Sequence, residues 1–213
     1  MGHSRAGEIP VTARLEVVGV RKAFGRHLVL RDISFRAGEG EIVAIVGENG
    51  SGKSTLLRIL VGFLPADRGE VRMAGSFGYC DQSPQVFPDL TVNEHFEYFS
   101  RGYGLNRETL IATRDALLTR FAFGSQASKR VSELSGGTVQ KLHLSLAVVH
   151  RPDLLLLDEP YVAFDWETYV RFWDFAIELR HRGTSVVIVS HIAHERHRFD
   201  RVLELRDGVL ACA

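Results

Sequence analysis

The residues from 47 to 54, Gly-Glu-Asn-Gly-Ser-Gly-Lys-Ser, fit the pattern G-x-x-x-x-G-K-[ST]. Glycines at these positions let the backbone curl until successive N–H groups point into one concavity, where a Cβ would block a phosphate. The pattern predicts that Lys53 bridges the β- and γ-phosphates of a nucleotide and that the Ser54 hydroxyl ligates Mg²⁺. A glycine-rich turn that binds nothing is the alternative. The residues expected to hold the nucleotide here are Gly47, Asn49, Gly50, Ser51, Gly52, Lys53, Ser54 and Thr55.

Two carboxylates end an apolar run further along the chain, Leu-Leu-Leu-Leu-Asp158-Glu159. A buried strand would deliver them at its carboxyl end, where ligands of parallel sheets bind. Asp158 would then hold Mg²⁺ through water, and Glu159 would orient and deprotonate an attacking water molecule. A solvated strand end or a helix cap is the alternative, which a phosphate loop upstream disfavours.

A third candidate, Ser135-Gly136-Gly137, directly precedes a helical pattern. The first turn of a helix offers unpaired N–H groups and the positive end of the helix dipole, so it can bind an anion. Taken alone, a simple helix cap by Ser135 is the more common case. A chain that already cradles its own phosphates has no need of a second such site, which suggests that this one serves the nucleotide of another molecule. The sequence therefore predicts a dimer when ATP is bound.

Alternating strand and helix patterns must position these residues. Apolar and β-branched runs predict strands at 14–20, 28–35, 41–46, 153–157 and 184–190, and helical spacing predicts helices at 54–64, 107–121, 139–149 and 167–182. Thr91 and Glu94 form a capping box that starts one further helix. The alternation indicates an α/β domain with a largely parallel sheet. We expect one domain over 1–213, with a helical subdomain inserted at about 84–151.

The amino-acid composition disfavours several classes of protein. Lys plus Arg and Asp plus Glu both total 26, so a broadly basic nucleic-acid-binding surface is not expected. Cys80 and Cys212 have neither metal-ligand spacing nor the density of a secreted scaffold, which favours an intracellular chain. The first ten residues lack the apolar core of a signal peptide, and no apolar run approaches the roughly 18 residues that span a bilayer. If the protein works at a membrane, another subunit must hold it there.

The chain closely resembles the ATP-binding-cassette ATPases. The resemblance is carried by the order and spacing of residues 47–55, 134–140, 154–160 and 190–191, and it runs from about residue 15 to 210. It implies a P-loop NTPase fold with a RecA-like, mostly parallel core and antiparallel N-terminal strands. It also implies that Phe24 stacks on adenine and that Gln82 contacts Mg²⁺ and water. Asp165 would communicate between paired subunits, and His191 would contact the γ-phosphate.

Each of these assignments has an alternative. Phe24 could be a core aromatic residue, and Gln82 could be a surface amide. His191, His194 and His197 are spaced in a way that suggests a metal site, but helical positions i, i+3 and i+6 do not stay on one face, and no carboxylate or thiol cluster completes a site.

The chain departs from the family pattern at Thr138, at Tyr161, Phe164 and Trp166 around the loop leading to Asp165, and at Asp81. None of these departures removes a phosphate, Mg²⁺ or water contact. They put the rate and the coupling between subunits in question, while the reaction itself is expected to remain.

The resemblance implies an ATPase subunit that uses ATP and Mg²⁺ to power a transporter. Residues 91–105 are similar to a stretch of exporter ATPases whose membrane subunits are separate chains, which favours export. The expected partners are an integral membrane permease and a second ATPase subunit, identical or related. The expected location is cytoplasmic, peripheral on the inner face of the cell membrane. A soluble cassette ATPase of translation or DNA repair is the alternative, and a P-loop kinase or GTPase is a weaker one.

Overall fold

The computed structural model describes residues 13–191 and 196–212, which form two sheets and the helices that cover them. The larger sheet has the strand order β5-β6-β7-β3-β8-β9, in which only β9 runs antiparallel to its neighbour. The smaller sheet is antiparallel, with the order β2-β1-β4. The strands are β1 (Ala13–Phe24), β2 (His27–Gly38), β3 (Ile42–Val46), β4 (Arg68–Met73), β5 (Phe77–Cys80), β6 (Leu154–Asp158), β7 (Ser185–Ser190), β8 (Arg201–Arg206) and β9 (Val209–Cys212).

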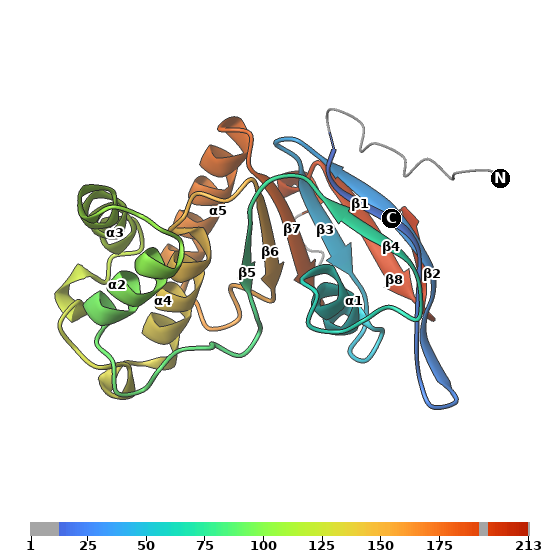
Figure 1. The fold of residues 1–213 in the computed structure, drawn as a ribbon, viewed down its shortest axis with the longest axis horizontal. Coiled ribbons are helices and arrows are strands. Elements are labelled where there is room, and N and C mark those ends of the chain that lie inside the picture. The colour runs from blue at the N-terminus through green and yellow to red at the C-terminus, as the bar shows by residue number, and fades with distance from the viewer. Residues whose placement is uncertain (1–12, 192–195, 213) are drawn as a thin grey trace.

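The helices follow the chain between these strands. They are α1 (Lys53–Leu60), α2 (Val92–Gly102), α3 (Arg107–Arg120), α4 (Gly136–Val148) and α5 (Trp166–His181), with short 3₁₀ turns η1 (Gly124–Gln126), η2 (Val131–Glu133) and η3 (Arg196–Arg198). Figure 1 shows α1 between the two sheets, and α4 and α5 on the other face of the larger sheet. None of the helices within the described residues is both long and apolar enough to cross a bilayer.

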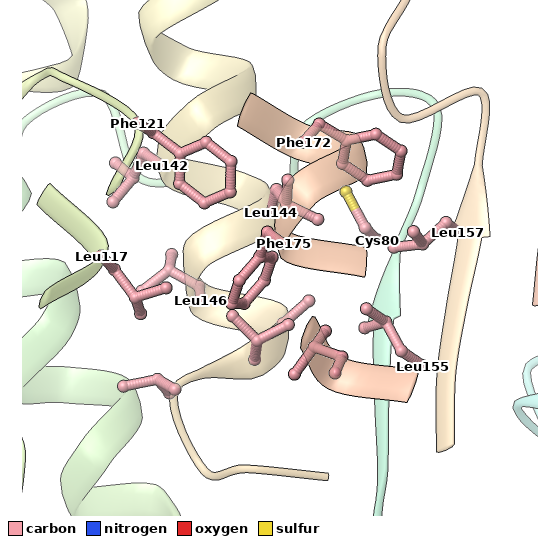
Figure 2. Packing of buried hydrophobic residues seen from close by; sticks show 14 of the residues in the cluster. Cys80, Leu117, Phe121, Leu142, Leu144, Leu146, Leu155, Leu157, Phe172 and Phe175 are labelled. Atoms are coloured by element: carbon pink, nitrogen blue, oxygen red, sulfur yellow. The ribbon is translucent and has the colours of Figure 1, made fainter. Parts of the chain in front are cut away.

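The central strands are apolar along their whole length because both faces of the larger sheet are covered. Every residue of β3, β6 and β7 is buried. In β6, Leu154 and Leu156 pack in the core that contains α1, whereas Leu155 and Leu157 pack in the core on the helical side. Figure 2 shows Leu155 and Leu157 directed toward Leu144 of α4 and Phe175 of α5. These two cores hold the carboxyl end of β6 in a fixed position.

Side-chain caps start four of the five α-helices. Thr91 accepts a hydrogen bond from the Glu94 N–H at 3.2 Å, and the Glu94 carboxylate accepts one from the Thr91 N–H at 2.7 Å, which confirms the predicted capping box. The side chains of Asn106, Ser135 and Asp165 each accept a hydrogen bond from the N–H three residues further on and so cap α3, α4 and α5. Helix α4 begins at Gly136 and not near residue 139 as predicted, since Ser135 is the cap and both glycines already lie in the first turn.

The predicted α/β fold with a mostly parallel sheet is confirmed, and so is each predicted helix and strand to within a few residues at its ends. Four strands were not predicted: β4, β5, β8 and β9. Strand β4, Arg-Gly-Glu-Val-Arg-Met, has no buried residue, so it lacks the apolar pattern that would reveal it. Strand β5 has only four residues and contains a glycine.

Two buried histidines, His95 and His143, and the half-buried His150 make the fold sensitive to acid. Burial lowers the pKa of His95, His143 and His150, and for His143 the pKa falls to about 4. A histidine with a lower pKa in the folded chain binds fewer protons than in the unfolded chain, so the free energy of unfolding rises with pH between the two values. Their stabilisation is complete above a pH of about 6.5 and is lost as the pH falls toward the folded-state values.

We expect the free energy of unfolding to fall from pH 7 to pH 5, with His143 alone contributing on the order of 2 kcal/mol. Urea unfolding followed by circular dichroism at a series of pH values measures this slope. A His150→Gln variant should show a shallower slope, since one of the three groups is removed. A stability that stays level or rises on acidification to pH 5 would contradict the assignment of these histidines as neutral in the folded chain.

Candidate nucleotide site

The phosphate loop connects the end of β3 to the start of α1. An ideal Cβ on Gly47 would lie 2.3 Å from the Leu205 carbonyl oxygen of β8, so only glycine fits where the loop leaves the sheet. The backbone then passes through positive φ at Gly50 and Gly52, and Gly52 is the residue that precedes α1. The loop therefore has the curled shape that the sequence pattern predicts, with the first turn of α1 directed at the concavity.

Lys53 closes this loop. Its Nζ donates to the carbonyl oxygens of Gly47 at 2.7 Å and Glu48 at 2.8 Å, and the side chain is buried. Burial lowers the pKa of Lys53, while the negative charges of Glu159 and Asp158 oppose that shift. The ammonium group thus lies within electrostatic reach of both carboxylates, where it could neutralise phosphate charge.

Glu159 and His191 meet at the carboxyl ends of β6 and β7. Asp158 of β6 pairs with Val189 of β7, and the next residue, Glu159, has a positive φ of 49° that turns its side chain out of the strand. Glu159 Oε1 accepts a hydrogen bond from the His191 N–H at 2.8 Å and lies 2.8 Å from His191 Nδ1. A strained backbone at a buried carboxylate is typical of catalytic positions. The structure therefore brings together the two residues expected to contact the attacking water and the γ-phosphate.

Asp158 suits a divalent cation. Its side chain is buried, and its Oδ2 has no hydrogen-bond partner among the described residues. Burial raises the pKa of Asp158, a hydrogen bond from Ser54 opposes this, and the charges of Asp81 and Glu159 raise it further. A carboxylate in this position is stabilised by a nearby cation, and hard oxygen donors such as Asp158 and Ser54 are what Mg²⁺ prefers. These residues fit the metal that the sequence predicts.

Ser135 and Asp165 lie on neighbouring loops on the helical side of the sheet. Ser135 and Gly136 are exposed, whereas an ideal Cβ on Gly137 would come within 2.9 Å of the Ala163 carbonyl oxygen. Ser135 Oγ accepts from the Thr138 N–H at 3.3 Å, so the helix-cap interpretation is correct, and the exposed first turn leaves the anion-site interpretation open. Hydrogen bonds from Thr168 hold the pKa of Asp165 below its usual range.

Phe24 and Gln82 are more exposed than Lys53, Asp158 and Glu159. Phe24 ends β1 in the smaller sheet and is 52% exposed, with Lys22 Nζ 5.6 Å from its ring centroid, so the core alternative for Phe24 is wrong. Gln82 is exposed and follows β5, whose last residue Cys80 pairs with Leu157 of β6. It therefore lies at the same edge of the sheet as Asp158 and Glu159.

The metal alternative for the three histidines gains no support. His191 pairs with Glu159, and His194 lies outside the described residues. Within 13–191 and 196–212, no group of three or more histidine, cysteine, aspartate or glutamate side chains is placed to hold a metal ion.

An aromatic cluster beside Glu159 was not predicted from the sequence. Tyr161, Phe164 and Trp166, the departures noted above, line a cleft of about 480 Å³ with Glu159, His191 and Trp173. The Tyr161 ring lies 5.4 Å from Tyr169 and 5.6 Å from Phe172, edge to face. The repeated aromatic residues between 161 and 173 were the available signal, but their meeting with Glu159 depends on how α5 packs.

A curled phosphate loop, a buried lysine and two carboxylates at the edge of a parallel sheet define the class: an α/β nucleotide-hydrolysing domain. A family model described as ABC transporter matches residues 30–162. Nod factor export ATP-binding protein I of Bradyrhizobium diazoefficiens is 33% identical over 91% of this chain and 68% of its own length. An uncharacterised ABC transporter ATP-binding protein of Methanocaldococcus jannaschii is 32% identical over 92% of this chain and 75% of its own.

A solved ATP-binding subunit of an ABC transporter superposes with a TM-score of 0.88 at 26% identity, covering 93% of this chain and 89% of that one. The chain belongs to the ABC transporter family, as an ATP-binding subunit with ATPase activity.

Proposed function

We propose that this subunit hydrolyses MgATP at a site shared between two ATPase subunits and thereby powers export through a separate membrane permease. The observation that carries the proposal is that the chain contains two sites suited to phosphate. Lys53, Asp158 and Glu159 lie together at one edge of the larger sheet, and a second helix has an exposed start at Ser135. We further propose that 1–213 acts as one unit, with a helical subdomain at about 84–151.

The chemistry follows from where the charges lie. The loop from Gly47 to Thr55 holds the phosphates through its N–H groups, and Lys53 moves from the loop carbonyls to the β- and γ-phosphate oxygens. Glu159, with His191 beside it, orients water for in-line attack on the γ-phosphorus and takes its proton. Ser54, Asp158 and Gln82 hold Mg²⁺, which supplies neutralisation of phosphate charge when bound.

We place the second nucleotide contact on another molecule because the two helix starts belong to separate helices. Helices α1 and α4 cover opposite faces of the larger sheet (Figure 1), so Ser135 is not part of the loop that surrounds Lys53. Ser135, Gly136 and Asp165 are exposed and form a surface suited to the nucleotide of a second subunit. Phe24, at the outer edge, is the candidate for stacking on adenine.

A Ser135→Arg substitution is expected to abolish ATP-driven dimer formation while leaving ATP binding to the monomer within about threefold, because the phosphate loop is on another element. Light scattering of the Glu159→Gln protein, with and without the added change, measures this in MgATP. Ser125→Arg, at an exposed position in η1, is the matched control. A dimer that forms equally well with the Ser135→Arg change would overturn the shared site but would leave the hydrolytic assignment standing.

The permease is proposed from the relatives and from one surface. Several relatives that match most of this chain are named export ATP-binding proteins. Phe87, Tyr98 and Tyr103 are exposed aromatic side chains, and the ring centroids of Phe87 and Tyr98 lie 5.4 Å apart. This surface follows the Gln82 loop along the chain, so a permease segment seated on it would lie near the loop proposed to contact Mg²⁺. The subunit would then be cytoplasmic, peripheral on the inner face of the membrane.

Purification of the tagged protein from gently solubilised membranes, followed by mass spectrometry, tests this assignment. A stoichiometric multi-span membrane protein is expected, and a Tyr98→Asp variant should lose it. Recovery from the soluble fraction alone, with ribosomes or DNA, would instead favour a soluble cassette ATPase.

A further inference from the structure

Three buried polar side chains, Cys80, Gln140 and His143, contact one another in the core next to the loops of the site. Cys80 is the last residue of β5 and is fully buried, and Gln140 and His143 lie three residues apart on one face of α4. Cys80 Sγ lies 3.4 Å from His143 Nδ1 and 3.8 Å from Gln140 Nε2. Gln140 Nε2 also donates to the Pro160 carbonyl oxygen at 3.3 Å.

The protonation states of Cys80 and His143 determine which group donates each hydrogen bond. Burial raises the pKa of the Cys80 thiol and lowers the pKa of His143, so both groups are neutral at pH 7. The Gln140 amide can only donate from Nε2, so the sulfur accepts there. The S–H has two acceptors in reach, His143 Nδ1 at 3.4 Å and the Asp81 carbonyl oxygen at 3.9 Å, and we assign it to the nearer one. His143 then carries its proton on Nε2, a tautomer that we assign from this network.

Packing alone does not require these polar groups. Figure 2 shows Cys80 in the core on the helical side, near Leu144 and Leu157. An apolar side chain of similar volume would fill the same space, whereas removing one partner of a buried hydrogen bond leaves the other unsatisfied. Three mutually satisfied polar groups in an apolar core specify one arrangement of the segments that carry them.

Those segments are the ones that carry the site. Gln82 lies two residues beyond Cys80, Ser135 begins the helix that carries Gln140 and His143, and Pro160 follows Glu159. We propose that Cys80, Gln140 and His143 are positioning residues for ATP hydrolysis, which hold the Gln82 loop and Glu159 in register with the Ser135 helix. This rests on the proposed function for the roles of Glu159, Gln82 and Ser135.

The test compares two substitutions of similar size at one position. His143→Asn can place an amide oxygen where Nδ1 lies and keeps the acceptor, whereas His143→Leu fills the volume without one. We expect His143→Leu to lower kcat about tenfold with KM for ATP within about twofold, because misplaced groups slow the chemical step while the phosphate loop stays intact. His143→Asn should retain kcat within about threefold.

A second variant and an NMR spectrum of the wild type distinguish the proposed hydrogen bond from a general folding defect. Cys80→Val should lower kcat like His143→Leu, and the double variant should be no slower than either, since both remove one interaction. Long-range ¹H–¹⁵N spectra of the wild type at pH 7 should show His143 protonated on Nε2. Equal kcat for His143→Leu and wild type, equal losses for Leu and Asn, or a proton on Nδ1 would each overturn the proposal. In any of these cases Glu159→Gln would still report separately on the proposed function.

Discussion

Replacing Glu159 with glutamine is expected to lower the rate of ATP hydrolysis at least about 100-fold, the usual contribution of a positioned general base. Glutamine keeps a carbonyl oxygen that can accept from the His191 N–H, which Glu159 now receives at 2.8 Å, so the local geometry should survive. What is lost is the capacity to take a proton from water. Affinity for ATP should therefore stay within about threefold.

Steady-state phosphate release and equilibrium binding of a fluorescent ATP analogue measure the two quantities for the Glu159→Gln protein. Glu97→Gln makes the same chemical change on an exposed face of α2 and should match the wild type. Hydrolysis at the wild-type rate in Glu159→Gln would remove Glu159 from the mechanism and would leave Asp158 as the carboxylate to test.

Replacing Lys53 with alanine should weaken ATP binding by at least about 30-fold and bring hydrolysis below detection, since charged hydrogen bonds to phosphate are among the strongest in proteins. Lys53 is the buried cation near Asp158 and Glu159. Without it, the phosphates would face two carboxylates and lose their main positive partner. The hydrogen bonds to the Gly47 and Glu48 carbonyls would also be lost, so the loop itself should loosen.

Isothermal titration with ATP, alongside a phosphate-release assay, measures both effects of Lys53→Ala. Lys129→Ala removes an exposed lysine beside the helical elements and is the matched control. Tight ATP binding by Lys53→Ala, with a normal unfolding curve, would mean that the backbone of the loop holds the phosphates unaided.

Local patterns were enough to predict most of the elements that carry the chemistry, but not β5, which leads to Gln82. The runs that became β3, β6 and β7 are apolar throughout, and a strand of this kind has to be covered on both faces, which indicates a parallel sheet. The capping box at Thr91 depends on residues three apart, and the phosphate loop on eight consecutive ones. Such features are visible in the sequence because their causes lie within one turn of helix or one loop.

Contacts between distant residues could not be predicted in the same way. Glu159 and His191 are 32 residues apart and meet only because β6 pairs with β7. The pattern of each strand records that it is buried but not which strand lies beside it. The same holds for Cys80 and His143, 63 residues apart. Strand β4 was missed for a different reason, because an exposed edge strand carries no apolar signal.

The aromatic cleft beside Glu159 gives the molecule an optical property. The chain has two tryptophans, and both Trp166 and Trp173 line that cleft. Trp166 is 71% exposed and Trp173 is 1% exposed, so one indole senses solvent and the other senses the core. All of the intrinsic tryptophan emission therefore originates in the cleft that Glu159 lines. A second subunit that covers Trp166 would shift that emission to shorter wavelength, so assembly could be followed in unlabelled protein.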